Sequence, residues 1–212
     1  MARILVFGDS ITYGAWDAIR GGWANRLKSF CMERELENPE FDYPVYNLGI
    51  SGDNSREMVK RFEFEASQRL EEDEPIIIFA IGINDSQFVK SEDDFRVPKN
   101  EFRKNIEQLI KFSRKFSSKI VFIGLTAVDE LKVNPNPWDN NKSYKNEYIE
   151  KYDFIIKSIC KEKKIHFINI YEEFNKLDYK KLLEDGLHPN LEGHQKMFEI
   201  VIDFLMERGI VK

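Results

Sequence analysis

Five short apolar runs constrain the fold of this chain more than any other feature of its sequence. They cover residues 4–7, 45–50, 76–81, 120–125 and 166–170 and are rich in Val, Ile and Phe. Within most of them apolar residues follow one another without alternation. That pattern is typical of strands buried on both faces of a parallel sheet. We therefore predict five parallel strands at these positions.

Amphipathic patterns with helical spacing separate the runs. Apolar residues recur at intervals of three and four within residues 23–31, 58–70, 102–116, 148–159 and 197–205. Such spacing places them on one face of a helix. Strands that alternate with helices of this length predict βαβ units, hence an α/β fold whose parallel sheet is covered on both sides.

Length and charge exclude several classes of protein. The 212 residues suit one domain, and the formal net charge is -5. An acidic chain with scattered Lys and Arg is a poor nucleic-acid binder, because phosphate contacts need concentrated positive charge. No apolar run is long enough to span a bilayer, so we expect no membrane partner.

The chain starts Met-Ala-Arg and enters a strand-like run at once. It lacks the charged region, apolar region and cleavage site of a secretory signal, which favours a cytoplasmic location, although a mature form without its signal would look the same. The two cysteines, Cys31 and Cys160, lie on apolar faces of expected helices. We expect both to be buried free thiols.

Polar residues that carry chemistry follow the expected strands. In an open α/β sheet, ligands bind beyond the carboxyl ends of the strands. The segments there are Gly8-Asp9-Ser10, Gly49-Ile50-Ser51-Gly52-Asp53-Asn54, Gly82-Ile83-Asn84-Asp85 and, after a further short helical stretch, Asp185-Gly186-Leu187-His188-Pro189-Asn190. Two long loops, residues 14–22 and 126–141, adjoin them, and loops of this length are usually functional.

A serine nucleophile needs an adjacent base, and the base needs an orienting carboxylate. Ser10 lies on a tight turn after a strand, and Asp185 precedes His188 by three residues. We predict Ser10 as nucleophile, His188 as base and Asp185 as the orienting carboxylate. Of the other histidines, His166 opens a strand and is expected to be structural. His194 is expected to pack inside the fold and is the one rival for the base.

An oxyanion needs hydrogen-bond donors that are in place before the reaction. The backbone N–H groups of Ser10 and Gly52 and the side-chain amide of Asn84 are the candidates. Taken alone, Gly52 could simply permit a turn. Asn84 taken alone could cap a following helix.

These segments resemble the four sequence blocks of the SGNH, or GDSL-like, hydrolases. Gly8-Asp9-Ser10-Ile11 resembles the first block, with Ile11 where Leu is commonest. Gly52 resembles the glycine of the second block, residues 82–85 the third, and residues 185–189 the last. The resemblance implies a single SGNH-type domain over residues 1–212, with a flavodoxin-like three-layer α/β/α sandwich and a five-stranded parallel sheet. It also implies the Ser10–His188–Asp185 triad and the oxyanion hole of Ser10, Gly52 and Asn84, without a metal or other cofactor.

Members of that family hydrolyse esters, thioesters, lysophospholipids or sugar O-acetyl groups. We expect a small soluble substrate with a short acyl chain, such as an acetyl ester of an alcohol or a sugar. Thioesterase and lysophospholipase activities remain alternatives. The expected pocket walls are Trp16 and Asp17 in the first long loop and residues 133–138, including Trp138, in the second. Asp9 and Asp85 are expected to hydrogen-bond loop backbone beside the site.

A second class of protein would use the same strand ends differently. Asp9, Asp53 and Asp85 could form a carboxylate cluster that holds Mg²⁺, as in phosphoryl-transfer or receiver-type α/β proteins. That hypothesis leaves Ser10, Asn84 and the Asp185–His188 pair without a role. A third possibility is an inactive binding module on the same fold. The presence of every triad residue disfavours it.

Overall fold

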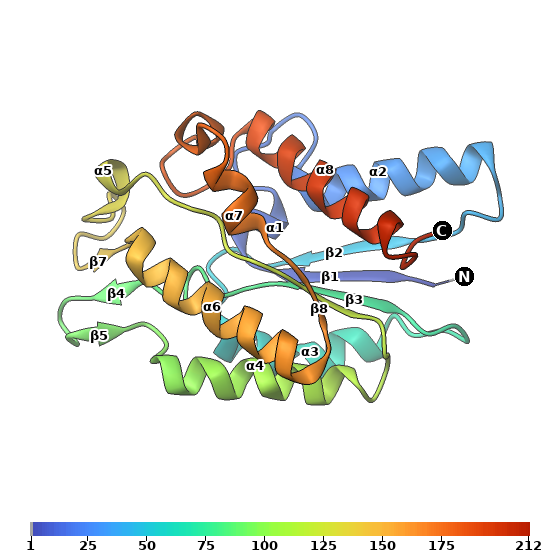
Figure 1. The fold of residues 1–212 in the computed structure, drawn as a ribbon, viewed down its shortest axis with the longest axis horizontal. Coiled ribbons are helices and arrows are strands. Elements are labelled where there is room, and N and C mark those ends of the chain that lie inside the picture. The colour runs from blue at the N-terminus through green and yellow to red at the C-terminus, as the bar shows by residue number, and fades with distance from the viewer. Residues whose placement is uncertain (1) are drawn as a thin grey trace.

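The computed structural model describes residues 2–212, and a five-stranded parallel sheet forms its centre (Figure 1). The strand order is β2–β1–β3–β6–β8. The strands are β1 (Ile4–Gly8), β2 (Val45–Gly49), β3 (Ile76–Ala80), β6 (Ile120–Ile123) and β8 (His166–Ile168). Every neighbouring pair is parallel. The predicted α/β fold and its five parallel strands are confirmed, each strand within a few residues of the apolar run that predicted it.

Long helices cover both faces of the sheet. They are α2 (Gly22–Glu37), α3 (Ser55–Ser67), α4 (Lys99–Ser113), α6 (Asn146–Lys163) and α8 (Leu191–Glu207). Figure 1 shows α2 and α8 on one side of the sheet and α3, α4 and α6 on the other. The three layers follow from the two apolar faces of the strands, each of which needs a helical cover.

Aromatic side chains fill the core between the sheet and α3. Phe7, Phe79 and Phe122 come from adjacent strands, and Phe62 comes from α3; all four are fully buried. The Phe7 and Phe79 rings stack with centroids 5.7 Å apart, and Phe62 meets the Phe7 ring edge-on at 4.9 Å. Such ring pairs add to the stability from area burial, by about 0.5–1.5 kcal/mol each. They give the strand ends a rigid support.

Side-chain caps fix where two of these helices begin. The Asn54 side chain accepts from the backbone N–H groups of Arg56 and Glu57. The Glu57 carboxylate in turn accepts from the Asn54 N–H, and the two together form a capping box at α3. Asn190 accepts from the N–H groups of Glu192 and Gly193 at α8. Asn54 and Asn190 are the last residues of the segments 49–54 and 185–190, so the caps also fix where these two segments end.

Several short elements carry no periodic signal, and of these the sequence predicted only the helical stretch between the last strand and Asp185, where α7 (Ile170–Asn175) and the 3₁₀ helix η1 (Tyr179–Leu182) lie. The others are α1 (Ser10–Tyr13), α5 (Glu130–Val133), and the strands β4 (Phe88–Val89), β5 (Asp94–Phe95) and β7 (Lys142–Ser143). The three short strands form a separate antiparallel sheet in the order β5–β4–β7. A strand of two residues is too short to show an alternation.

The strand ends that precede the candidate site lie at one level. Gly8, the last residue of β1, pairs with Gly49 of β2 and with Ala80 of β3. From β1 the chain first adds β2 on one side of the sheet and then adds β3, β6 and β8 on the other, so the direction of winding changes between β1 and β3. The crevice at such a point is where open α/β sheets bind ligands.

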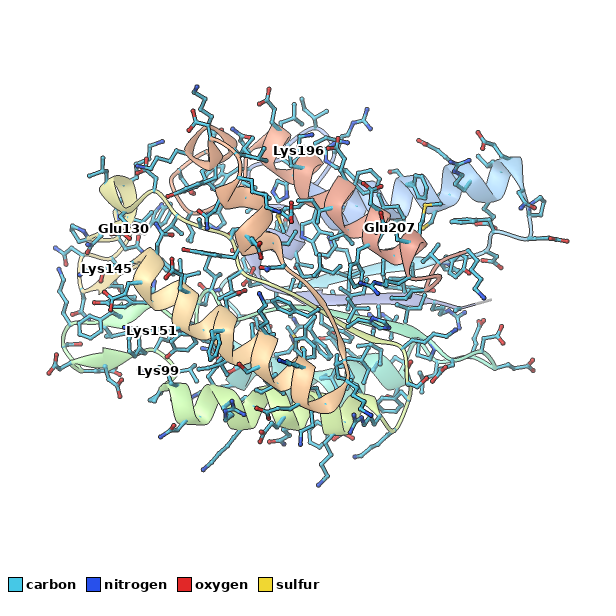
Figure 2. The ribbon with its side chains drawn as sticks, in the orientation of Figure 1. Lys99, Glu130, Lys145, Lys151, Lys196 and Glu207 are labelled. Atoms are coloured by element: carbon cyan, nitrogen blue, oxygen red, sulfur yellow. The ribbon has the colours of Figure 1, made fainter. Side chains whose placement is uncertain are left out.

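The outer faces of the helices are charged. The labelled side chains Lys99, Lys151 and Lys196 are exposed on α4, α6 and α8 (Figure 2). Over residues 2–212, no helix is both long and apolar enough to cross a bilayer. Cys31 and Cys160 are free and buried, as predicted, and burial raises the pKa of each thiol to about 12.

Candidate active site

Ser10 is held in a turn of very tight geometry at the end of β1. It opens α1, and the Asp9 carboxylate caps that helix by accepting from the Ile11 N–H at 2.9 Å. A Cβ on Gly8 would lie 2.0 Å from Thr12 Oγ1, so only glycine lets the helical turn pack this closely on the strand. The Ser10 hydroxyl therefore projects from a fixed backbone at the edge of the sheet.

His188 and Asp185 approach Ser10 from the other end of the chain. They lie between η1 and α8, where Gly186 adopts a φ of 93°. Ser10 Oγ lies 2.9 Å from His188 Nε2, and His188 Nδ1 lies 2.7 Å from Asp185 Oδ2. With Nδ1 protonated and donating to Asp185, Nε2 accepts from the Ser10 hydroxyl.

Four donors converge on the Asp185 carboxylate. Oδ1 accepts from the backbone N–H groups of Leu187 (2.9 Å) and His188 (2.8 Å). Oδ2 accepts from His188 Nδ1 and from the indole N–H of Trp16, at 2.7 and 2.5 Å. Burial raises the pKa of Asp185, but the hydrogen bonds and charge of His188 outweigh burial and bring this pKa to about 2. The carboxylate therefore stays ionised wherever the histidine can act as a base.

Besides Ser10, the two other oxyanion candidates, Gly52 and Asn84, follow the neighbouring strands β2 and β3. Gly52 adopts a φ of 83°, and an added Cβ there would meet no atom within 4 Å, so the side-chain position of Gly52 faces open space. Arg96 donates to the Gly52 carbonyl at 2.8 Å. The Asn84 amide donates to the Asp53 carbonyl at 2.9 Å and accepts from the Tyr144 hydroxyl at 3.0 Å. These contacts fix which side of Asn84 carries the N–H groups, and one of its two amide hydrogens remains for a ligand.

Asn84 does not cap a helix, the alternative that its sequence position allowed. The chain after β3 instead runs through turns into β4, and the next helix, α4, begins at Lys99. The Asn84 side chain accepts a hydrogen bond from the hydroxyl of Tyr144 and not from the end of a helix. Tyr144 is buried.

The carboxylates of the magnesium hypothesis are each occupied by a different protein donor. Asp9 accepts from the Ile11 N–H, and Asp85 accepts from the Ser55 N–H at 3.0 and 3.1 Å. Asp53 forms an ion pair with Arg61 at 2.6 Å. Across residues 2–212, no three His, Cys, Asp or Glu residues are grouped as metal ligands. The geometry does not favour the magnesium hypothesis.

Burial perturbs the two aspartates beneath the site. It raises the pKa of Asp9 to about 6, against the hydrogen bond from Ile11 and the charge of His188. It raises the pKa of Asp85 to about 7, against the hydrogen bonds from Ser55. A carboxyl that is taken out of water without a full counter-charge holds its proton more tightly.

Arg61 links two of the strand-end segments, and the sequence analysis missed it. From α3 it donates to the Gly8 carbonyl at 3.1 Å and to the Asp53 carboxylate, and its guanidinium lies 5.7 Å from the Phe7 ring centroid. It thus fixes the residues just before Ser10 and just after Gly52. No local pattern marks Arg61, because its contact with the Gly8 carbonyl joins residues 53 positions apart. Tyr144 and Arg96 were missed for the same reason.

Two exposed tryptophans flank His188, one from each long loop. Trp16 lies against the Asp185–His188 pair, and the Trp138 ring meets the His188 ring edge-on, with centroids 6.0 Å apart. They are 58% and 54% exposed. The prediction that Asp17 and Val133 line the pocket is wrong. Asp17 is buried in an ion pair with Arg26, and Val133 is fully buried in the core.

His194 is not placed to act on Ser10. Its Nε2 lies 3.0 Å from the Ala15 carbonyl, and its Nδ1 accepts from the Trp23 N–H at 3.3 Å. The ring is fully buried, and burial lowers the pKa of His194. The structure therefore leaves His188 as the histidine in contact with the serine.

The fold and these contacts define an α/β protein in which a serine, a histidine and an aspartate meet at the carboxyl edge of a parallel sheet. Such an arrangement suits acyl transfer. The chain belongs to the GDSL-like Lipase/Acylhydrolase family, whose model matches residues 6–196. It is therefore an enzyme that hydrolyses ester bonds, as the resemblance in the sequence implied.

Relatives with known names agree with that class. The chain is 24% identical over 221 aligned residues to the isoamyl acetate-hydrolyzing esterase of Saccharomyces cerevisiae, covering 95% of this chain and 87% of the relative. The solved lipase/acylhydrolase from Enterococcus faecalis superposes with a TM-score of 0.77 at 22% identity, over 98% of this chain and 97% of that one. The acetylxylan esterase Axe2 from Geobacillus stearothermophilus superposes with a TM-score of 0.71 at 22% identity, over 97% and 93%.

Proposed function

We propose that this enzyme hydrolyses short-chain, chiefly acetyl, esters of small alcohols or sugars through Ser10, His188 and Asp185. The observation that carries the proposal is the unbroken hydrogen-bonded series from Ser10 Oγ through His188 to Asp185, with contacts of 2.9 and 2.7 Å. Each link has the geometry that general-base activation of a serine requires.

In the first half of the reaction, Ser10 Oγ attacks the ester carbonyl while His188 Nε2 takes the serine proton. The tetrahedral intermediate collapses when the imidazolium gives that proton to the leaving alkoxide. The alcohol departs, and the acyl group stays on Ser10. Water then attacks the acyl-serine with His188 again as base, which releases the acid and restores the serine. Asp185 stabilises the imidazolium in both halves.

The backbone N–H groups of Ser10 and Gly52 and the free amide hydrogen of Asn84 are our proposed oxyanion donors. Each such donor contributes about 3–4 kcal/mol to lowering the barrier. Arg96 and Tyr144 support this proposal, because their contacts to the Gly52 carbonyl and to Asn84 Oδ1 hold two of the three donors in fixed orientations.

The acyl preference rests on the relatives and on the surroundings of His188. Two of the named relatives act on acetyl esters, one of an alcohol and one of xylan. Trp16 and Trp138 flank the histidine that protonates the leaving group, so their exposed indoles are placed to contact the alcohol or sugar part of the substrate. Flat aromatic faces bind the apolar faces of such groups.

The test is hydrolysis of p-nitrophenyl acetate by the native enzyme and by Ser10→Ala, each with and without EDTA. We expect turnover by the native enzyme, no effect of EDTA, and a loss of at least about 10³-fold in Ser10→Ala. Retained activity in Ser10→Ala, or its loss with EDTA, would refute the proposal. A series of p-nitrophenyl esters from acetate to decanoate then tests the acyl preference, and rates that rise with chain length would overturn it.

Three expectations of the sequence analysis stay predictions. They are a single domain over residues 1–212, a cytoplasmic location, and a small-molecule ester rather than a nucleic acid or a membrane as the binding partner.

A further inference from the structure

Trp16 combines three features that rarely occur together. It is a large apolar residue that is 58% exposed, its backbone adopts a φ of 68°, and its indole N–H donates to Asp185 Oδ2 at 2.5 Å. A left-handed backbone in a bulky residue other than glycine costs of order 1–3 kcal/mol and persists only where the surroundings enforce it. A function that depends on the position of the indole accounts for the strain.

The surroundings of Trp16 enforce that position from both sides along the chain. The carbonyl of Ala15 accepts from His194, which is buried in α8. The carboxylate of Asp17 accepts from the backbone N–H groups of Arg20 and Gly22, at 2.9 and 3.0 Å, and pairs with Arg26 at 2.8 Å. In Figure 1 the loop that follows α1 accordingly lies beside the N-terminal end of α8.

Close backbone approach closes the base of the same loop. Gly14 has a φ of 98°, and a Cβ there would lie 2.0 Å from the Gly21 carbonyl oxygen. The loop thus returns on itself at Gly14 and Gly21, and Trp16 lies in the segment between them. Trp16 is held toward Asp185 by a buried network and does not reach it by chance rotation of a mobile side chain.

At Asp185 the indole and the imidazole share one acceptor. Trp16 Nε1 and His188 Nδ1 lie 3.3 Å apart. Nδ1 carries a proton when Nε2 accepts from Ser10, so it cannot also accept from the indole. The two N–H groups are therefore neighbouring donors that both point at Asp185 Oδ2. The carboxylate cannot rotate away from His188 without breaking the Trp16 bond as well.

We propose that Trp16 is a positioning residue for catalysis, whose indole N–H fixes Asp185 and, through Asp185, the tautomer and orientation of His188. This inference rests on the proposed roles of Ser10, His188 and Asp185. The network of Asp17, Arg26 and His194 serves to hold Trp16 in its strained backbone, which gives these buried polar residues a role in activity as well as in folding.

Trp16→Phe is the test variant, since it keeps an aromatic ring and removes the N–H. For p-nitrophenyl acetate we expect kcat to fall about tenfold, as suits the loss of a hydrogen bond to a charged acceptor. Any change in KM reports the smaller ring and its contact with the substrate, so the fall in kcat is the measure of the lost N–H. The low-field proton NMR signal of the His188–Asp185 hydrogen bond should move further downfield, because Oδ2 then has one donor fewer to satisfy.

A second variant separates the hydrogen bond from the shape of the ring. Incorporation of 3-benzothienylalanine at position 16 keeps the bicyclic indole outline but replaces N–H by sulfur. It should reproduce the kcat loss of Trp16→Phe, with an unchanged thermal midpoint as the check on folding. Native kcat in either variant, or a change confined to KM, would overturn the inference.

The Ser10→Ala result distinguishes the two possible failures. If Ser10→Ala stays active, the proposed function itself fails. If Ser10→Ala is inactive while both position-16 variants behave as the native enzyme, the proposed function stands and only the role of Trp16 is refuted.

Discussion

The two long loops that flank His188 each present a tryptophan, but they are built by different physical means. The first, residues 14–22, contains three glycines with positive φ and a buried Asp17–Arg26 ion pair. The second, residues 126–141, contains two prolines and no glycine. Short-range hydrogen bonds from side chains to nearby backbone hold much of it. The Asp129, Asn136 and Asp139 side chains each accept from the N–H two residues further on.

The difference shows in what each tryptophan can do. Trp16 is tied through its neighbours to α2 and α8, and its N–H reaches Asp185. Trp138 has a local anchor, a bond from its backbone N–H to Asn136, and it meets His188 through its ring. A residue that must hold a carboxylate within a few tenths of an ångström needs a long-range support. A residue that only offers an apolar face can be presented by local turns.

Removal of the long-range support should have the largest effect. Asp17→Ala leaves the Arg26 guanidinium buried without its carboxylate and removes the acceptor of three loop N–H groups. We expect the free energy of unfolding to fall by about 3–5 kcal/mol, the usual cost of breaking one side of a buried pair. Urea unfolding at pH 7 measures the change.

The matched control for that variant lies in the other loop. Asn136→Ala removes one local hydrogen bond, the one to the Trp138 N–H, and should cost about 1 kcal/mol. Equal losses in the two variants would contradict the distinction between a long-range and a local support.

Acid should weaken the first loop in a defined window. Burial raises the pKa of Asp17, but the N–H groups of Arg20 and Gly22 and the charge of Arg26 outweigh burial, so this pKa lies below its usual value. A carboxyl with a lowered folded pKa contributes stability that is present above its unfolded pKa, about 3.9, and is lost as the pH falls below it. The contribution of Asp17 should therefore be complete at pH 6 and should decline below about pH 4.

Thermal melts of the native enzyme and Asp17→Asn, taken from pH 6 to pH 2.5, measure this contribution. We expect the gap in Tm between the two to be constant down to about pH 4 and to shrink below it. In the second loop, Asp139 is half-buried and pairs with Lys142 at the surface, so the gap for Asp139→Asn should be much smaller than the gap for Asp17→Asn. A gap for Asp17→Asn that does not change with pH would mean that the charge of Asp17 contributes nothing.

Both loops also show what sequence reasoning could and could not reach. The strands and the long helices follow from periodicity within each segment, and the residues after each strand follow from the rule that parallel strands end at one edge. Ser10, His188 and Asp185 could be predicted as a triad because a serine, a histidine and an aspartate, the residues that serine catalysis needs, follow those strands. The contact between Trp16 and Asp185 joins residues 169 positions apart, and no local pattern encodes it.

The errors have the same origin. Asp17 follows Trp16 directly, and a charged loop residue beside a site is a natural pocket wall. Asp17 is buried because it pairs with Arg26, which lies on α2 directly after the loop. Two opposite charges that neutralise each other can be buried together. In the second loop, Val133 is buried because it lies on the face of α5 that packs on the core. Which loop residues point inward depends on the packing of the loop as a whole.

The smallest effect should come from the tryptophan with the local support. In Trp138→Ala the apolar face beside His188 is lost, while the bonds among Ser10, His188 and Asp185 do not involve the removed ring. We expect KM for p-nitrophenyl acetate to rise about threefold with kcat within twofold, the size of a partly exposed aromatic contact. The free energy of unfolding should change by no more than about 0.5 kcal/mol, because the side chain is half exposed. If Trp138→Ala instead lowered kcat as strongly as Trp16→Phe, the two tryptophans would act alike on His188, and the difference in how their loops are built would have no consequence for catalysis.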